Sequence, residues 1–170
     1  MKIRQAKSCD IDEIMKIFSV ARDFMRRSGN KNQWINGYPQ RELILRDIKN
    51  GCFFVIEDDE GKIRAGFSFI IGEEETYKLI EGGSWKDQTR YGTIHRIASD
   101  GTIKGVMPAA VRFCQSKIPH IRADTHADNA VMRRQLEKCG FEMRGIIYVE
   151  PGNPRLAFEI SERKEEQRRS

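Results

Sequence analysis

Two histidines in the C-terminal half of the chain have the chemistry to move protons. His95 lies within the segment Thr-Ile-His-Arg-Ile-Ala-Ser, and His126 follows the segment Ile-Arg-Ala-Asp-Thr. Because imidazole changes charge near neutral pH, either side chain could act as a general base or acid. Each could equally be a hydrogen-bonded histidine of the fold, since alternate side chains of a strand point to opposite faces. Tyr148, on a later apolar segment, is a third group that could donate a proton.

Two further positions are typical of ligand binding at the start of a helix. Lys104 and Gly105 precede the segment Val-Met-Pro-Ala-Ala-Val-Arg-Phe-Cys, whose apolar residues recur with helical spacing. A helix N-terminus presents free backbone N–H groups and the positive end of its dipole to an anion. Asn129 opens the next helical segment, where its side chain could both cap the helix and contact a ligand.

The elements that must position these residues follow from apolar periodicity and turn residues. We predict strands over 2–5, 52–56, 63–70, 92–98, 121–126, 141–149 and 155–160, and helices over 11–27, 41–49, 106–117 and 129–139. The segment 72–89 is predicted to be mostly loop. This order predicts a mixed sheet flanked by helices, of the α/β or α+β class. We expect one domain over 1–160, followed by a charged tail over 161–170.

The stretch from Ile94 to Phe141 resembles the GNAT superfamily of N-acetyltransferases, and the order of elements extends the likeness over most of the chain. The family's central strand often has the pattern apolar-x-Arg-Ile/Leu-Ala-Val, which reads Ile94 to Ser99 here. The next helix opens at Asn129 and ends in Lys138–Cys139–Gly140–Phe141, with the family spacing kept. The resemblance implies a mostly antiparallel mixed sheet with splayed central strands. It also implies direct transfer of an acetyl group from acetyl-coenzyme A to a primary amine.

The resemblance further implies which residues would bind coenzyme A and carry the reaction. Backbone groups of the splayed strands would pair with the pantetheine arm, one N–H of 97–99 would stabilise the oxyanion, and the loop before the helix would hold the pyrophosphate. The expected cofactor-binding residues are Ile97, Ala98, Ser99, Lys104, Gly105, Val106, Met107, Asn129 and Arg133. His95 and His126 are the expected bases, and His126 or Tyr148 the expected acid.

Two departures from the family pattern affect these expectations. The family loop reads Gln/Arg-x-x-Gly-x-Gly/Ala, whereas the segment 100–108 is about two residues short and contains Pro108, which lacks an N–H. We therefore expect a weaker phosphate site, to which Lys104 contributes its charge. Leu136 occupies the position where many members carry a tyrosine that protonates the thiolate. A thiol with a pKa of about 8.5 can leave without an acid near neutral pH.

Aromatic and acidic residues in the predicted loops indicate how an acceptor amine could bind. Trp34, Tyr38 and Trp85, together with Glu73–Glu74–Glu75 and Glu81, would form an acidic, aromatic lip suited to a cationic amine. That amine could belong to a small molecule or to a peptide. Alternatively, these charges are solvated and the aromatic rings anchor the loops.

The composition is that of a globular protein with a basic surface. The 170 residues carry a net charge of +5, and a hydrophobic content of 39% is enough for one core. The four cysteines are scattered without metal-ligand spacing, so we expect neither a metal site nor a disulfide framework. No apolar run reaches the length of a membrane span, and we expect a cytoplasmic monomer or homodimer.

Two other functions stay open on the sequence alone. A protein of the same fold with little or no turnover could bind or sense acyl-coenzyme A, which the short loop and Leu136 favour. A nucleic-acid-binding domain would suit the positive charge. However, the Lys and Arg residues are dispersed and no recognition motif is present, so we expect no nucleic-acid partner.

Overall fold

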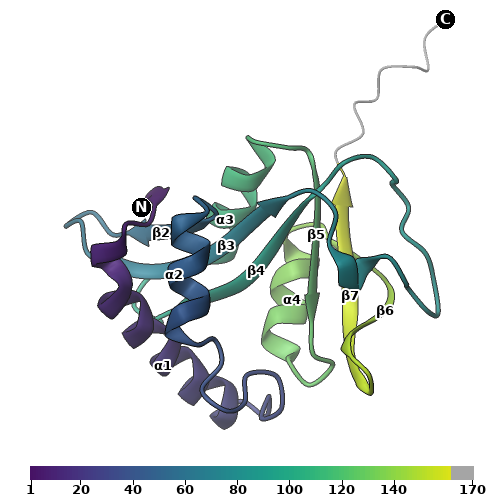
Figure 1. Cartoon of the computed structure of the whole chain (residues 1–170), viewed down its shortest axis with the longest axis horizontal. Helices are drawn as coiled ribbons and strands as arrows, with labels where there is room; N and C mark the ends of the chain where they lie inside the picture. The colour runs from purple at the N-terminus through teal and green to yellow at the C-terminus, as the bar shows by residue number, and fades with distance from the viewer. Residues whose placement is uncertain (162–170) are drawn as a thin grey trace, which may run out of the picture.

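The chain forms one seven-stranded sheet that is flanked by helices on both faces (Figure 1). The computed structural model describes residues 1–161. The strands are β1 (Lys2–Gln5), β2 (Phe53–Glu57), β3 (Ile63–Ile71), β4 (Gly92–Ser99), β5 (His120–Thr125), β6 (Glu142–Glu150) and β7 (Asn153–Ser161). The helices are α1 (Ile11–Arg27), α2 (Arg41–Lys49), α3 (Val106–Gln115) and α4 (Ala130–Lys138), with short 3-10 turns at Ser8–Asp10 and Glu75–Tyr77. The predicted order of strands and helices is confirmed, with ends that differ by a few residues.

The sheet has the order β1-β2-β3-β4-β5-β7-β6 and is antiparallel except between β4 and β5. These two strands are parallel and pair only at Gly92 with Ile121 and at Thr93 with Arg122. Beyond that point β4 continues beside β3 to Ser99, while β5 continues beside β7. The mixed, mostly antiparallel sheet with splayed central strands is therefore confirmed.

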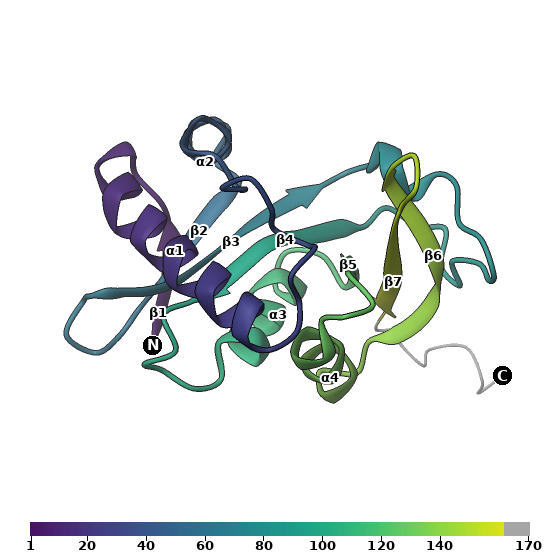
Figure 2. The ribbon, with the colours of Figure 1, turned by 90° about the horizontal axis from the view of Figure 1, so that it is seen from below.

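Alternation along the strands divides the core into two layers, one on each face of the sheet. Phe53 and Val55 pack in the cluster formed by α1 and α2, whereas Phe54 and Ile56 pack in the cluster that includes α3 and α4. Figure 2 shows α1 and α2 on the opposite side of the sheet from α3 and α4. Because side chains alternate with a period of two, this short apolar run serves both layers.

The C-terminal strand reaches Ser161, so this residue belongs to the sheet rather than to the predicted charged tail. The rest of that tail, 162–170, lies outside the described residues. Between residues 1 and 161, none of the helices combines the length and apolar character that a membrane span requires. The same part of the chain contains no group of three or more His, Cys, Asp or Glu side chains placed to hold a metal ion.

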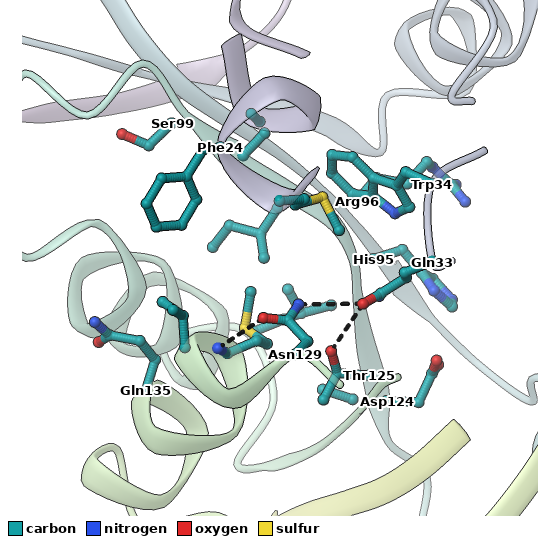
Figure 3. A pocket seen from close by; sticks show the side chains of 18 of the residues that line it. Phe24, Gln33, Trp34, His95, Arg96, Ser99, Asp124, Thr125, Asn129 and Gln135 are labelled. Atoms are coloured by element: carbon teal, nitrogen blue, oxygen red, sulfur yellow. Dashed lines mark hydrogen bonds between the residues drawn. The ribbon is translucent and has the colours of Figure 1, made fainter. Parts of the chain in front are cut away.

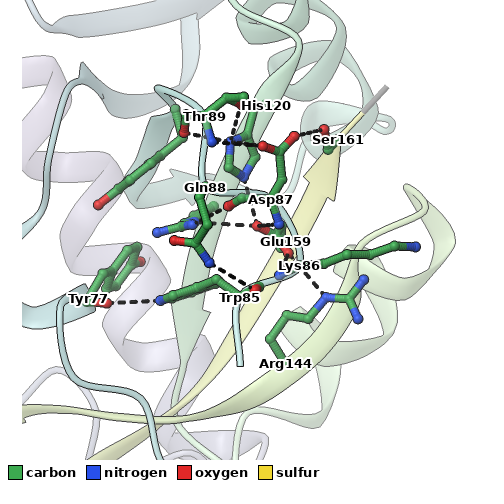
Figure 4. Close-up of polar contacts among 12 residues, drawn as sticks. Tyr77, Trp85, Lys86, Asp87, Gln88, Thr89, His120, Arg144, Glu159 and Ser161 are labelled. Carbon is green, nitrogen blue, oxygen red and sulfur yellow. Dashed lines mark hydrogen bonds and ion pairs between the residues drawn. The ribbon is translucent and has the colours of Figure 1, made fainter. Parts of the chain in front are cut away.

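A buried network of charges fastens the segment 72–91 to the sheet (Figure 4). Glu159 on β7 is only 2% exposed, and its carboxylate lies 2.7 Å from Nε2 of His120 and 3.1 Å from Nε of Arg144. The same carboxylate accepts a hydrogen bond of 2.9 Å from the backbone N–H of Lys86. One side chain thus joins the segment 72–91 to β5, β6 and β7.

Trp85 packs inside this part of the core. The guanidinium of Arg122 lies 4.0 Å from the ring centroids of both Trp85 and Tyr91, and the Trp85 indole N–H donates to the carbonyl of Tyr77 at 2.8 Å. Cation–π contact and burial explain the position of the ring. The prediction that Trp85 contributes to an acceptor lip is therefore wrong.

The Glu159 network predicts how stability depends on pH. Burial alone would raise the pKa of Glu159, but the His120 and Lys86 hydrogen bonds and the Arg122 charge outweigh it and lower the pKa below 4.5. A carboxylate with a lowered pKa stabilises the fold above its ordinary pKa, and this contribution is lost as pH falls through the lowered value. We expect Glu159→Gln to lower the free energy of unfolding at pH 7 by about 3–5 kcal/mol, because it leaves buried cations without a counter-charge.

Denaturant unfolding at pH 7 and at successively lower pH below 4.5 measures this effect. The difference between wild type and Glu159→Gln should shrink over that acidic range. Glu142→Gln is the matched control, because its exposed carboxylate contacts the same Arg144 and should contribute less than about 1 kcal/mol. An equal difference at every pH would contradict the assignment.

Candidate active site

A cavity of about 1320 Å³ opens where β4 and β5 diverge. Its walls come from the end of α1, the segment 32–40, β4 with the loop 99–105, the starts of α3 and α4, and the β6–β7 hairpin. Figure 3 shows side chains from several of these elements pointing into one space. The volume exceeds the roughly 300–1,000 Å³ that is usual for one small ligand. The cavity is therefore larger than one small ligand requires.

A bulge in β4 forms the floor of the cavity. Arg96 has a φ of +52°, and the register with β3 shifts between Gly66 and Ser68. A left-handed residue in a strand costs about 1–3 kcal/mol and persists only when its surroundings hold it. Buried Asp47 of α2 provides that support, since its Oδ2 accepts from Nη2 of Arg96 at 2.7 Å and from Nε at 3.1 Å. The hydroxyl of Ser68 donates to the same oxygen at 2.6 Å.

The aromatic side of the cavity is anchored to this floor. The Tyr38 hydroxyl accepts from Nη1 of Arg96 at 3.3 Å. Trp34 packs edge-on against Phe18 with 5.5 Å between ring centroids, and 6.3 Å separates its centroid from that of Tyr38. Trp34, Tyr38 and Glu74 of the predicted lip line the cavity. The lip residues outside its lining are Glu73, Glu75, Glu81 and Trp85.

Gln33 joins the loop between α1 and α2 to the far side of the cavity. Its Oε1 accepts from Nδ2 of Asn30 at 3.0 Å, Oγ1 of Thr125 at 3.2 Å, the N–H of His126 at 3.4 Å and Nδ2 of Asn129 at 3.1 Å. Figure 3 shows the contacts to Thr125 and Asn129. The sequence analysis missed this residue, because a glutamine in a predicted loop carries no periodic or motif signal.

His95 is the histidine that the structure brings to the cavity. Its Nε2 lies 3.0 Å from Oε2 of Glu74, and the Tyr91 hydroxyl accepts from the backbone N–H of Glu74 at 2.8 Å. The hydrogen bond from His95 is the main reason why the pKa of Glu74 lies below its ordinary value. Glu74 therefore stays a carboxylate at neutral pH and can accept the Nε2 proton, which leaves Nδ1 of His95 as the basic nitrogen.

Asp124 is a second carboxylate in the cavity wall (Figure 3). The hydroxyl of buried Tyr77 donates to its Oδ2 at 2.6 Å. Burial and the charge of Asp124 raise the pKa of Tyr77 well above its ordinary value, so the phenol stays protonated. The network that fixes the segment 72–91 thus also holds Tyr77 against Asp124.

The β4 side of the cavity fits a ligand that carries amides and phosphates. Within the described residues β4 has no β5 partner after Thr93, so its backbone groups that face away from β3 lack strand partners. Gly105 is the N-cap residue before α3, with a φ of +76° and no side-chain hydrogen bond to the helix. The N–H groups of Val106 and Met107 in the first turn can therefore bind an anion. Asn129 caps α4, as predicted, because its Oδ1 accepts from the N–H of Met132 at 3.0 Å.

The loop between β4 and α3 already uses some of its own N–H groups. The N–H of Gly101 donates to Oγ of Ser99 at 3.0 Å, and the N–H of Thr102 donates to Oδ1 of Asp100 at 2.9 Å. Fewer groups are left for a phosphate, and a weaker phosphate site remains the expectation. The predicted cofactor-binding residues that line the cavity are Ile97, Ala98, Ser99, Lys104, Gly105, Val106, Met107 and Asn129.

Two of the three predicted catalytic residues lie outside the cavity lining. Nδ1 of His126 accepts from the N–H of Asp128 at 3.1 Å, because the chain turns into α4 directly after β5. Tyr148 is exposed on the face of β6 opposite to buried Ile147, and its hydroxyl donates to Oε2 of Glu81 at 3.0 Å. Of the three predicted catalytic residues, only His95 therefore lines the cavity.

Arg133 is the one predicted cofactor-binding residue outside the lining. Its Nη1 donates to the carbonyl of Ala127 at 3.2 Å, which turns the side chain back over the start of α4. Leu136 is fully buried in the core and forms part of the cavity lining. No hydroxyl group is thus present at the position where many GNAT members have a tyrosine.

Comparison with solved structures agrees with this geometry. A GNAT-family acetyltransferase from Streptococcus agalactiae is 35% identical, with a TM-score of 0.83 over 96% of each chain. Two more GNAT-family acetyltransferases share the fold. The one from Listeria monocytogenes is 17% identical, with a TM-score of 0.70 over 94% of each chain. The one from Bacillus cereus is 16% identical, with a TM-score of 0.61 over 96% of this chain and 98% of the other. The chain matches no protein-family model and no curated protein. The identity and coverage of the Streptococcus protein show that the chain belongs to the GNAT family of acetyltransferases.

Proposed function

We propose that the protein transfers the acetyl group of acetyl-coenzyme A directly to a primary amine. The observation that carries this proposal is the divergence of β4 from β5 beside a cavity larger than one small ligand requires. The protein would act in the cytoplasm, as the sequence predicts.

The residues of β4 and of the two helix starts would hold the donor. The backbone between Ile97 and Ser99 would pair with the pantetheine amides, and one N–H there would stabilise the developing oxyanion. The N–H groups of Val106 and Met107 and the charge of Lys104 would face the pyrophosphate. Acetyl-coenzyme A supplies the acetyl group as a thioester.

His95 and Glu74 would prepare the acceptor. Glu74 holds Nε2–H of His95, so the lone pair of Nδ1 can take a proton from the ammonium or from a water between them. The neutral amine nitrogen then forms a bond to the acetyl carbon and releases its second proton to solvent water. The carbon–sulfur bond breaks, and its electron pair leaves with the sulfur. No acid is required at the sulfur, because a thiolate is a stable leaving group near neutral pH.

Acyl-coenzyme A binding without turnover is the second candidate. Two features favour it. Leu136 cannot donate a proton to the sulfur, and the loop 99–105 uses some of the N–H groups that would otherwise position the phosphates. Amine-dependent release of free thiol from acetyl-coenzyme A separates the two candidates, since only an acetyltransferase produces it.

Coenzyme A should raise the melting temperature of the protein, because a ligand that binds only the folded state stabilises it. We expect Lys104→Ala to weaken binding roughly 10-fold through loss of one charge-assisted contact to phosphate. Lys138→Ala is the control, because it removes an exposed charge in the last turn of α4, outside the cavity lining. Equal affinity of wild type and Lys104→Ala in calorimetric titration would remove Lys104 from the site.

We expect His95→Ala to lower kcat/KM roughly 10²–10⁴-fold, the usual loss for a general base. Glu74→Gln should lower kcat/KM less, because the neutral amide replaces the carboxylate that accepts the Nε2 proton and orients the imidazole. Glu75→Gln is the matched control, since its exposed carboxylate contacts Lys78 outside the cavity. Initial rates of acetylation at a fixed neutral pH measure the effect. An unchanged kcat/KM in both His95→Ala and Glu74→Gln would exclude this pair from proton transfer.

A further inference from the structure

Arg155 is a buried cation in the cavity wall that forms no ion pair within the described residues. It lies on β7, is 6% exposed and lines the cavity. Its Nη1 donates to Oδ1 of Asn153 and, at 3.0 Å, to the carbonyl of Pro154. Between residues 1 and 161 no ion pair involves Arg155, and neither Nε nor Nη2 has a hydrogen-bond partner. The N–H groups of Nε and Nη2, on one edge of the planar guanidinium, are therefore available to a ligand.

The other cations of the cavity wall differ from Arg155 in this respect. Arg96 is paired with Asp47, while Arg27 and Lys104 are exposed to water. Burial is unfavourable for a charged guanidinium, and it lowers the pKa of Arg155 despite the attraction of Asp124, Tyr38 and Glu150, none of which forms an ion pair with it. A buried arginine is normally paired, so an unpaired one beside a cavity is typical of an anion-binding group.

Asp124 lies close to Arg155 but does not neutralise it through a direct contact. β5 and β7 pair Asp124 with Ala157, and Arg155 is two residues from Ala157 on the same face of the sheet. Asp124 instead accepts from the hydroxyl of Tyr77. One wall of the cavity thus presents an anionic group and a cationic group side by side.

We propose that the acceptor is an amine that also carries a carboxylate, such as a free amino acid. Arg155 binds the carboxylate through Nε and Nη2, and Asp124 attracts the ammonium before it loses its proton. This assignment rests on the proposed acetyltransferase function. The phosphates of the donor do not need Arg155, because the loop 99–105 and the start of α3 lie on the β4 side of the gap, whereas Arg155 lies on β7 beyond β5.

Free amino acids and their C-terminal amides form matched pairs that test the charge. The amide keeps the amine and the side chain but removes the negative charge. We expect wild type to acetylate the best free amino acid with a kcat/KM roughly 10- to 100-fold higher than that of its amide, the usual effect of one charge-assisted bidentate contact. Arg155→Met should reduce this ratio to about one, and Arg155→Lys should restore part of it because a point charge remains. Arg134→Met, on the exposed side of α4, should leave the ratio unchanged.

Thermal shifts with coenzyme A keep this inference separate from the proposed function. Arg155→Met should bind coenzyme A as wild type does, and a loss of that binding would assign Arg155 to the donor and overturn the inference. Turnover of amines with equal rates for acids and amides would also overturn it while leaving the acetyltransferase function intact. If no amine is acetylated, the coenzyme A-loaded protein is titrated with the same pairs. A further rise in melting temperature with the free acids that is absent in Arg155→Met supports the anion site, and no such rise refutes it.

Discussion

The ion pair between Arg96 and Asp47 is the interaction on which the shape of the active site depends. It crosses from β4 to α2 and holds Arg96 in a backbone conformation that is unfavourable within a strand. A bulge bends its strand and increases the local twist, and in this sheet the bulge at Arg96 lies just beyond Thr93, the last β4 residue that pairs with β5. The cost of the strained residue is offset by a buried, multiply hydrogen-bonded carboxylate. Asp47 thus supports the cavity without lining it.

The divergence of β4 and β5 leaves backbone groups of β4 without strand partners and opens a gap whose opposite wall is held by the loop after α1. Backbone groups inside a protein require hydrogen-bond partners, and a gap in a sheet leaves some of them free. A ligand with its own amides can supply those partners, and this is the role proposed for the arm of coenzyme A. The side chain of Gln33 draws the loop after α1 to β5 and to the cap of α4, so the opposite wall is held at a fixed place.

Burial distinguishes the structural charges of this protein from those available for chemistry. His95 and His120 each contact a glutamate, but the first pair lines the cavity and the second is sealed beneath the segment 72–91. The arginines differ in the same way. Arg122 lies between two aromatic rings beside Glu159, whereas Arg155 is buried against the cavity and contacts no carboxylate of residues 1–161. This difference is the reason why we place the proposed acceptor site at the β7 wall.

The order of the elements, the mixed sheet flanked by helices and the capping role of Asn129 could be predicted from the sequence, because each depends on periodicity or on a residue acting on its own helix. The same local signals identified the strand around Arg96 and the helix start at Gly105. They could not decide which polar side chains meet in the cavity. His126 and Tyr148 have suitable chemistry but lie outside the lining, while Gln33, Glu74 and Asp124 meet there from distant segments. Pairing of remote residues depends on how the strands register and where they part, and that is decided only when the sheet has folded.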